Sequence, residues 1–552
     1  MSTTETSAQL SNDPGTPRHG RGARPVMAVA ALAAAAALLW LGYYSLSWTV
    51  PATSDGGAIA LQARDMLHGN WLLHGWVVAD VSFWTTELPE YALVELVRHL
   101  GPGIIHASAA VTYTLLVLLA GLLARGRARG GEGWVRGLVA AGIMLAPQLG
   151  YGAFVLLLSP DHTGTQVPLL LGWLVLDLAP RHWWVPVFLG LLLAWTQVGD
   201  RVTVLTAVVP LILVCLARAV RAPRERRFEL SLAAAAVASV AVAQAAEALL
   251  TRAGWFTVYP LNLALSPARQ LWTHTWLTGW GIQELYGANF LGVSGWPRIL
   301  FAVVHIAGLV LAVAGCVLAL WRFLRLRADA DLVDSVLAVA IVCNLLSYIV
   351  STDAGTVLGT GYNAREIAAV LPLGAVLAGR VIGPRLSRGP ARLCQLEKEA
   401  PRVRPGYVAP CLCLLACYGA ALGYGAAQPA APGDDADLAA WLAGHHLTYG
   451  LGRAESNIVT VDSGGSAHLA VVTDRGGWVR EDLYQSQRSW YDPRLHFADF
   501  IVASTPPGTF EYVPDLILMG DAHRTFGPPA RVYHFRGYTV LVWDVNLLTR
   551  LR

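Results

Sequence analysis

Long blocks of almost uncharged apolar residues recur along this chain up to residue 427, and they constrain its fold more than any other feature. A helix needs about 20 such residues to cross a bilayer. Only 14% of the 552 residues are charged, against about 25% in a typical soluble protein. We therefore predict a polytopic α-helical membrane protein with about eleven transmembrane helices. The expected spans are residues 26–48, 106–124, 135–157, 165–179, 183–198, 202–220, 229–250, 298–321, 332–351, 364–382 and 407–427.

The spans expected between residues 165 and 220 are short, and their limits are left open. They are separated by Pro180 and by Gly199-Asp200-Arg201. Proline removes a helical hydrogen bond, and ionisable groups are costly within a membrane. Broken or partly re-entrant helices therefore fit this part of the sequence as well as three full crossings do.

The placement of arginine predicts the orientation in the membrane. With a cytoplasmic N-terminus, the expected cytoplasmic connections hold the basic runs near 125–136, 218–227, 322–327 and 380–404, whereas the outer connections hold few arginines. This agrees with the positive-inside rule. Residues 1–25 are polar, and we expect a disordered cytoplasmic tail there. An odd number of spans then places the C-terminus on the outer side.

Two long loops are expected on the outer side, at residues 49–105 and 251–297. In the first, Ala58 to Leu67 has apolar residues at helical spacing, which predicts an interfacial helix along the membrane. The second is rich in aromatic residues. An aromatic belt at the lipid–water boundary explains most of them, and stacking on a sugar would need only one or two.

Beyond residue 427 the apolar content falls, and residues 428–552 are expected to form a small extracytoplasmic α/β domain. Residues 26–427 would form the transmembrane domain. In the soluble domain, Leu438 to Leu447 predicts a helix. Short runs rich in β-branched and aromatic residues predict strands at 457–462, 469–473, 500–503, 516–519 and 538–543.

Asp55 is the strongest candidate for catalysis, because it follows the first span directly in the run Ser54-Asp55-Gly56-Gly57. A carboxylate at an outer membrane face can serve as a base toward a substrate hydroxyl. The alternative is that Asp55 caps the helix that follows. Glu87 lies among aromatic residues in the same loop. It could bind an acceptor hydroxyl or a metal, or be a solvated loop charge.

Three further outer positions carry candidate substrate contacts. Asp161 and His162 lie in the turn after the third span, where they could hydrogen-bond a substrate, share a divalent ion with Asp55, or simply form a turn. Arg201 could meet a phosphate or pair with its neighbour Asp200. Arg365 could hold a phosphate oxygen with Glu366 orienting it. The alternative is an Arg–Glu pair that snorkels to the interface.

Familiar nucleotide and metal motifs are missing from the sequence. It has no Gly-rich Lys loop, no GxGxxG after a strand, no HExxH and no nucleotide-sugar Asp-x-Asp signature. The sequence therefore requires no cofactor and no metal, although a divalent cation could take part. Nothing in it indicates nucleic-acid binding.

This pattern of spans, loops and Asp55 resembles the GT-C superfamily of integral-membrane glycosyltransferases. It is most similar to the bacterial branch of protein O-mannosyltransferases and aminoarabinose transferases, and the Ala- and Arg-rich composition resembles that of an actinobacterium. The resemblance implies a polyprenyl-phosphate sugar donor, Asp55 as base, and Arg201 and Arg365 as phosphate contacts. The chain departs from the mannosyltransferases in one respect. Gly56 stands where those enzymes often have Glu, so the acceptor need not be protein.

The leading hypothesis is a glycosyltransferase at the outer face of a bacterial plasma membrane. It would move a sugar from a polyprenyl phosphate to a hydroxyl of a glycan, lipid or protein. A flippase for lipid-linked glycans and a non-catalytic envelope scaffold are the alternatives. The sequence leaves open the sugar, the acceptor, any metal, the oligomeric state and the role of the C-terminal domain.

Overall fold

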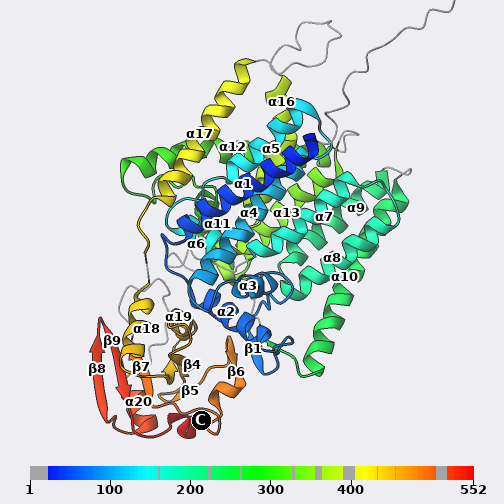
Figure 1. Ribbon diagram of the computed structural model, residues 1–552. Helices are drawn as coiled ribbons and strands as arrows, with labels where there is room; N and C mark the ends of the chain where they lie inside the picture. Colours follow the sequence, from blue (N-terminus) through cyan, green and yellow to red (C-terminus); the bar gives the residue numbers. More distant parts are fainter. Residues whose placement is uncertain are drawn as a thin grey trace, which may run out of the picture.

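The computed structural model describes residues 23–158, 162–221, 225–260, 264–325, 330–354, 363–388, 405–431, 433–453, 455–504 and 519–551. A helical part reaches from α1 to α17, and a separate domain built around a β-sheet follows it (Figure 1). The helical elements up to α10 are α1 (Ala23–Ser47), α2 (Ser54–Leu67), α3 (Leu88–Glu95), α4 (Gly103–Arg125), α5 (Gly130–Met144), α6 (Tyr151–Leu157), α7 (Thr163–Leu178), α8 (Trp184–Gly199), η1 (Val204–Val208), α9 (Val209–Arg221) and α10 (Arg226–Arg252). Those that follow are η2 (Ala268–Gln270), α11 (Leu271–Leu285), α12 (Trp296–Leu324), α13 (Leu332–Val350), η3 (Thr352–Ala354), η5 (Ala364–Ile367), α15 (Val370–Leu377), η6 (Ala378–Ile382), α16 (Gly383–Arg388) and α17 (Pro405–Ala426).

Six helical runs among the described residues are long and apolar enough to cross a membrane. They are Val29–Ser47, Gly103–Arg125, Arg226–Arg252, Trp296–Leu324, Leu332–Val350 and Ala364–Leu386. Four shorter apolar helices accompany them, at Thr163–Leu178, Trp184–Gly199, Val204–Val220 and Leu412–Ala426. At 1.5 Å per residue, a helix of 16 residues is about 24 Å long. The three helices of the 163–220 region are therefore separate and short for a bilayer core of about 30 Å.

The predicted continuous span at 135–157 is wrong. The chain leaves α5 at Met144 and starts α6 only at Tyr151. Pro147 lies between the two helices, and Gly150 before α6 has a φ of 92°. Proline has no N–H for a helical bond, and a positive φ does not continue a right-handed helix. The segment is apolar over most of its length, but its backbone cannot form one continuous helix.

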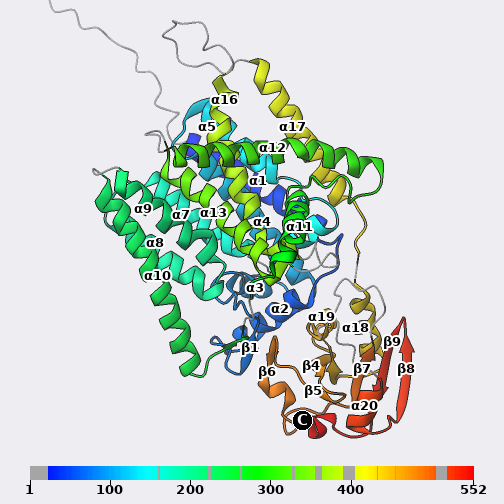
Figure 2. The same cartoon turned by 180° about the vertical axis from the view of Figure 1, so that it is seen from behind.

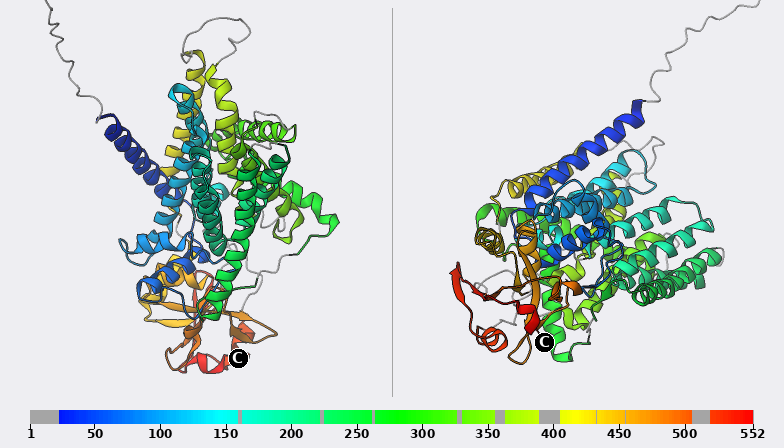
Figure 3. Two further views of the ribbon diagram at one scale, coloured as in Figure 1. Left: turned by 90° about the vertical axis from the view of Figure 1, so that its right-hand side faces the viewer. Right: turned by 60° about the horizontal axis from the view of Figure 1, so that its bottom comes forward.

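The C-terminal domain lies against one end of the helical part, beside α2 and β1, whereas α16 lies at the opposite end (Figures 1 and 2). The side view of Figure 3 shows the same arrangement. A small sheet joins segments from distant parts of the chain. In it β1 (Trp76–Val78) pairs in parallel with β2 (Thr257–Val258) and in antiparallel fashion with β6 (Ser486–Gln487). Both long loops of the helical part are thus hydrogen-bonded to each other, and the first is hydrogen-bonded to the C-terminal domain.

The C-terminal domain has a six-stranded mixed sheet in the order β5-β4-β3-β7-β9-β8. The bounds are α18 (Asp434–Gly444), β3 (Tyr449–Gly452), α19 (Ser456–Asp462), β4 (His468–Asp474), β5 (Val479–Glu481), η8 (Arg488–Tyr491), β7 (Phe500–Ser504), α20 (Met519–Phe526), β8 (Arg531–Phe535), β9 (Tyr538–Val542) and η9 (Leu547–Arg550). Residues of α18 and α19 pack on one face, and residues of α20 and η9 pack on the other. The expected α/β class is confirmed.

One predicted strand, 457–462, is in fact the helix α19. Its Ile-Val-Thr-Val run favours a strand locally, but β-propensity is weak against tertiary context. Strands β3 and β4 on either side of it pair in parallel. A parallel pair needs a crossover, which is usually a helix. The predicted strands at 469–473, 500–503 and 538–543 correspond to β4, β7 and β9, and residues 516–518 lie outside the described part of the chain.

The helix predicted at 58–67 forms as α2, but its surroundings differ from the expectation. Most of its residues are buried, and α19 packs closely against it. A Cβ atom added at Gly57 would lie 2.8 Å from the backbone nitrogen of Ile458, so glycine is required for this approach. Helix α2 therefore packs between the helical part and the C-terminal domain. It is not an interfacial helix that lies alone along the membrane.

Candidate active site

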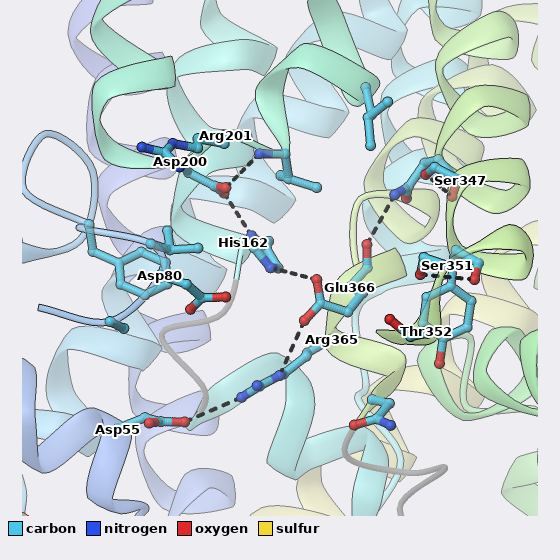
Figure 4. A pocket seen from close by; sticks show the side chains of 18 of the residues that line it. Asp55, Asp80, His162, Asp200, Arg201, Ser347, Ser351, Thr352, Arg365 and Glu366 are labelled. Atoms are coloured by element: carbon cyan, nitrogen blue, oxygen red, sulfur yellow. Dashed lines mark hydrogen bonds and ion pairs between the residues drawn. The ribbon is translucent and has the colours of Figure 1, made fainter. Parts of the chain in front are cut away.

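A cavity of about 450 Å³ lies where the helical part meets the C-terminal domain. Charged side chains from five separate segments line it (Figure 4). They are Asp55 of α2, Asp80 after β1, His162 before α7, Asp200 and Arg201 after α8, and Arg365 and Glu366 of η5. Tyr484 and Gln485 of the C-terminal domain also contribute to the wall.

Asp55 lies in the first turn of α2. The cap of this helix is Thr53, whose hydroxyl accepts a hydrogen bond from the amide of Gly56 at 3.2 Å. The capping role considered for Asp55 therefore belongs to Thr53, and Asp55 faces the cavity. Its Oδ2 lies 3.3 Å from Nη1 of Arg365, and its Oδ1 accepts a 2.8 Å hydrogen bond from Nε2 of Gln485. The positive end of the helix dipole also favours a carboxylate here.

The glycine that follows Asp55 is explained by packing. A Cβ atom at Gly56 would lie 2.9 Å from Cγ2 of Ile105 on α4, a distance that real Cβ atoms essentially never show. A side chain at this position would therefore require the Ile105 side chain to move. Glycine thus suits the contact between α2 and Ile105 of α4.

Arg365 and Glu366 form the centre of the cavity wall. Arg365 reaches Asp55 on one side, and its Nε lies 3.4 Å from Oε1 of Glu366 on the other. The side chain of Arg365 is 23% exposed, so solvent or a ligand can reach it. The predicted contact between Arg365 and Glu366 is confirmed, and the pair lines the cavity.

His162 links two carboxylates across the cavity. Its Nδ1 lies 2.8 Å from Oδ2 of Asp200, and its Nε2 lies 3.0 Å from Oε2 of Glu366. The residue has a φ of 58°, which aims the ring from the start of α7 into this position. Burial opposes the charged ring, but the two carboxylates outweigh it and hold the pKa of His162 well above its usual range. His162 is therefore a cation near neutral pH.

Asp200 does not pair with Arg201, so this alternative from the sequence is wrong. Its carboxylate also accepts hydrogen bonds from the Thr165 hydroxyl at 2.7 Å and from the amide of Val202 at 2.9 Å. The Arg201 side chain turns to Glu247 of α10, 2.8 Å away, and remains half exposed. Arg201 still lines the cavity.

These contacts form a continuous row of alternating charges, Asp55–Arg365–Glu366–His162–Asp200 (Figure 4). Each charged group has an opposite charge on at least one side. Such a row can hold ionised groups in a partly buried site, because every charge is paired and hydrogen-bonded. The row also places one carboxylate end, Asp55, and one partly exposed guanidinium, that of Arg365, at the cavity.

Glu87 does not reach the cavity wall. Its side chain is buried, and its Oε1 accepts a 3.0 Å hydrogen bond from the amide of Gly164 in the first turn of α7. Burial raises the pKa of Glu87 to about 8. Glu87 thus lies outside the cavity lining and binds the first turn of α7, next to His162. Asp161 lies outside the described residues.

Sequence reasoning missed Asp80, Tyr484 and Gln485. Burial, followed by the charge of Glu366, raises the pKa of Asp80, although Arg365 and His162 act against this. No motif marks Asp80 in the sequence, since it only follows an apolar strand. Gln485 and Tyr484 lie in a domain for which the sequence suggested no contact with Asp55.

The wall also includes polar uncharged groups from the end of α13 and the segment after it. They are Asn344, Ser347, Ser351 and Thr352 (Figure 4). Hydroxyl and amide groups are suited to hydrogen-bond a polyhydroxylated ligand. Within the described ranges, no three His, Cys, Asp or Glu side chains are grouped so that they could hold a metal ion.

No family model matches this chain, and no curated protein matches its sequence. A solved structure, ArnT from Cupriavidus metallidurans bound to undecaprenyl phosphate, matches its fold with a TM-score of 0.52. The chain has an ArnT-like fold. The match covers 95% of this chain and 99% of ArnT, at 15% sequence identity. The match confirms the expected fold of the chain and nothing beyond the fold.

Proposed function

We propose that this protein is a membrane glycosyltransferase that moves a sugar from a polyprenyl-phosphate donor to an acceptor hydroxyl. The observation that carries the proposal is the cavity in which Asp55 and Arg365 lie side by side. A carboxylate next to an exposed guanidinium provides a base and a phosphate-binding group in one place. The ArnT-like fold supports the donor class, since ArnT was solved with undecaprenyl phosphate.

In the proposed reaction, Asp55 accepts the proton of the acceptor hydroxyl. The hydroxyl oxygen forms a bond to the anomeric carbon of the donor while the bond from that carbon to the phosphate oxygen breaks. The electron pair leaves with the polyprenyl phosphate, and the configuration at the anomeric carbon inverts. Stabilisation of such developing charge by fixed cationic donors is commonly the largest catalytic contribution.

Arg365 is the proposed main contact for the leaving phosphate. In the structure it is shared between Asp55 and Glu366. A phosphate oxygen would compete for its exposed side, and the bidentate fork of arginine suits that exchange. Arg201 is the second proposed phosphate contact, at the rim. His162, held by Asp200 and Glu366, keeps Glu366 in place as Arg365 changes partners.

The proposed location is a bacterial plasma membrane, with the cavity and the C-terminal domain on the outer side. The distribution of arginines in the sequence supports this orientation. In the proposed complex, the hydroxyl-rich wall near Ser347 and Ser351 holds the sugar or the acceptor. A divalent cation is not needed by this scheme, because polyprenyl phosphate is a good leaving group.

Asp55→Asn tests the proposal directly. We expect at least a 100-fold loss of turnover, since general-base catalysis contributes about 10²- to 10⁴-fold. The measurement is release of polyprenyl phosphate from synthetic polyprenyl-phosphate hexoses and pentoses by purified protein, with bacterial membrane lipid as the acceptor source. Binding of undecaprenyl phosphate should be retained.

Asp65→Asn is the matched control for this variant. Asp65 lies on the same helix α2, and its Oδ2 accepts hydrogen bonds from Trp76 and Asn70 away from the cavity. An asparagine oxygen can still accept one of them, so turnover should stay near that of the wild type. Full turnover by Asp55→Asn would remove Asp55 from the mechanism. Movement of labelled lipid-linked sugar across vesicles without formation of a glycosidic bond would contradict the transferase itself.

A further inference from the structure

The C-terminal domain is firmly joined to the helical part. Ile458 and Val461 of α19 belong to the same buried cluster as the helices of the membrane part. The ring of Trp490 lies 5.1 Å from that of Trp76, and β6 pairs with β1. The domain is therefore part of one packed unit with α2, which carries Asp55.

Gln485 is one of two described residues of this domain that line the cavity, and it contacts Asp55. It has a φ of 52°, in the left-handed region that side chains other than glycine seldom adopt. Such strain costs of order 1 kcal/mol and persists only where the surroundings enforce it. Here the carbonyl of Gln485 accepts a 3.2 Å hydrogen bond from the Asn457 side chain. The preceding residue, Tyr484, packs edge-on against Tyr259 of the second long loop at 5.1 Å.

This backbone conformation places the side-chain nitrogen Nε2 of Gln485 2.8 Å from Oδ1 of Asp55, to which it donates a hydrogen bond. The other oxygen, Oδ2, faces Arg365 at 3.3 Å. The two donors come from different parts of the protein, the C-terminal domain and η5. Rotation of the Asp55 carboxylate would disturb both contacts, so both contribute to its orientation.

We propose that Gln485 is a positioning residue for Asp55, and that the C-terminal domain completes the active site rather than only covering it. This inference rests on the function proposed above. A hydrogen bond to a charged group contributes more than one between neutral groups, and it favours the ionised form of a carboxylate. Gln485 thus holds the Asp55 carboxylate in its orientation while Arg365 engages the substrate phosphate.

Gln485→Leu removes the donor and keeps the apolar volume. We expect about a 10- to 100-fold loss of turnover number, the range that corresponds to one hydrogen bond with a charged partner. The KM for the lipid donor and the binding of undecaprenyl phosphate should stay within about twofold, because Gln485 lies on Asp55 and not on the proposed phosphate contact.

Gln485→Glu gives a sharper test, since it keeps the shape and places a second carboxylate against Asp55. Turnover should fall further at neutral pH and recover partly at lower pH, where the new carboxyl group is protonated and can donate a hydrogen bond. Gln487→Glu is the matched control. Gln487 lies two residues along the chain, and its side-chain amide contacts the carbonyl of His74 at 3.5 Å. It should show neither the loss nor the pH-dependent recovery.

A double-mutant cycle in thermal stability separates this inference from the proposed function. The destabilisation caused by Gln485→Glu should be largely relieved in an Asp55→Asn background. Absence of that coupling would overturn the contact itself. Coupling together with an unchanged turnover number of Gln485→Leu would overturn the positioning role. Failure of the proposed function would appear separately, as full turnover by Asp55→Asn.

Discussion

Two arginines only 15 positions apart, Arg365 and Arg380, illustrate how the same chemistry can serve different purposes. Arg365 lies in the cavity, 23% exposed, with contacts of 3.3 and 3.4 Å to Asp55 and Glu366. Arg380 lies in η6 near the opposite end of the helical part, with its side chain 7% exposed.

All three nitrogens of the Arg380 guanidinium make contacts within the protein. Its Nη2 contacts Asp331 at 2.9 Å and Asp177 at 3.2 Å, its Nη1 donates to the carbonyl of Leu123 at 3.1 Å, and its Nε donates to Asp334. This cluster joins α4, α7, α13 and η6. The comparison indicates that an arginine surrounded by carboxylates stabilises the fold where its side chain is enclosed and all its nitrogens are bonded. Where a cavity exposes part of the side chain, the arginine can also contact a ligand.

The largest effect is expected from breaking the Arg380 cluster. Arg380→Met would leave three carboxylates near one another without their cation, which typically costs about 3–5 kcal/mol. We expect a strong drop in the unfolding temperature measured in detergent.

Asp177→Asn combined with Asp334→Asn should partly restore stability in the Arg380→Met background, because neutral partners no longer repel. If Arg380→Met alone melts like the wild type, the cluster is not structural and the comparison fails.

Arg365→Gln should show the opposite profile. A partly exposed ion pair contributes about 0–1 kcal/mol, so the unfolding temperature should change little. Turnover should fall about 100-fold or more, since a cationic donor to a leaving phosphate acts mainly in the transition state. Release of polyprenyl phosphate and a melting curve in detergent measure the two quantities.

Arg252→Gln, at the exposed end of α10, is the control for Arg365→Gln and should change neither quantity. A large loss of stability in Arg365→Gln, at normal turnover, would place this arginine in the same structural class as Arg380.

A pH-dependent effect on stability is expected at Glu87, a buried acid outside the cavity lining. Its pKa is raised from 4.5 to about 8 by burial. Stability from the protonated group is therefore complete below about pH 4.5 and is lost as the pH rises to about 8. The total is on the order of 5 kcal/mol.

Glu87→Gln keeps an oxygen for the amide of Gly164 and removes the titration. Unfolding temperatures measured from pH 5 to pH 9 should fall less steeply than those of the wild type. Equal slopes in the two proteins would show that Glu87 is not held neutral in the folded state.

The helical class of the protein and its α/β domain were predictable because apolar blocks and strand periodicity are local properties. Errors occurred where local preference and tertiary context disagree. The apolar run 135–157 is interrupted at Pro147, and the β-branched run 457–462 is helical because it connects two parallel strands. The surroundings of α2 were likewise beyond prediction, since they depend on a domain that follows it by nearly 400 residues.

Sequence alone determined that Asp55 follows an apolar helix directly and that His162 and Arg365 lie at the starts of later helices. These positions were predictable because a local change in composition marks each helix boundary. Only the tertiary structure decided which of these groups meet. Arg365 reaches Asp55 across 310 positions of chain, and Gln485 reaches it across 430. Contacts so distant in sequence arise from the packing of whole elements, which no local pattern records. For the same reason Glu87, an acid in the same loop as Asp55, is buried behind the wall while Asp80 lines the cavity.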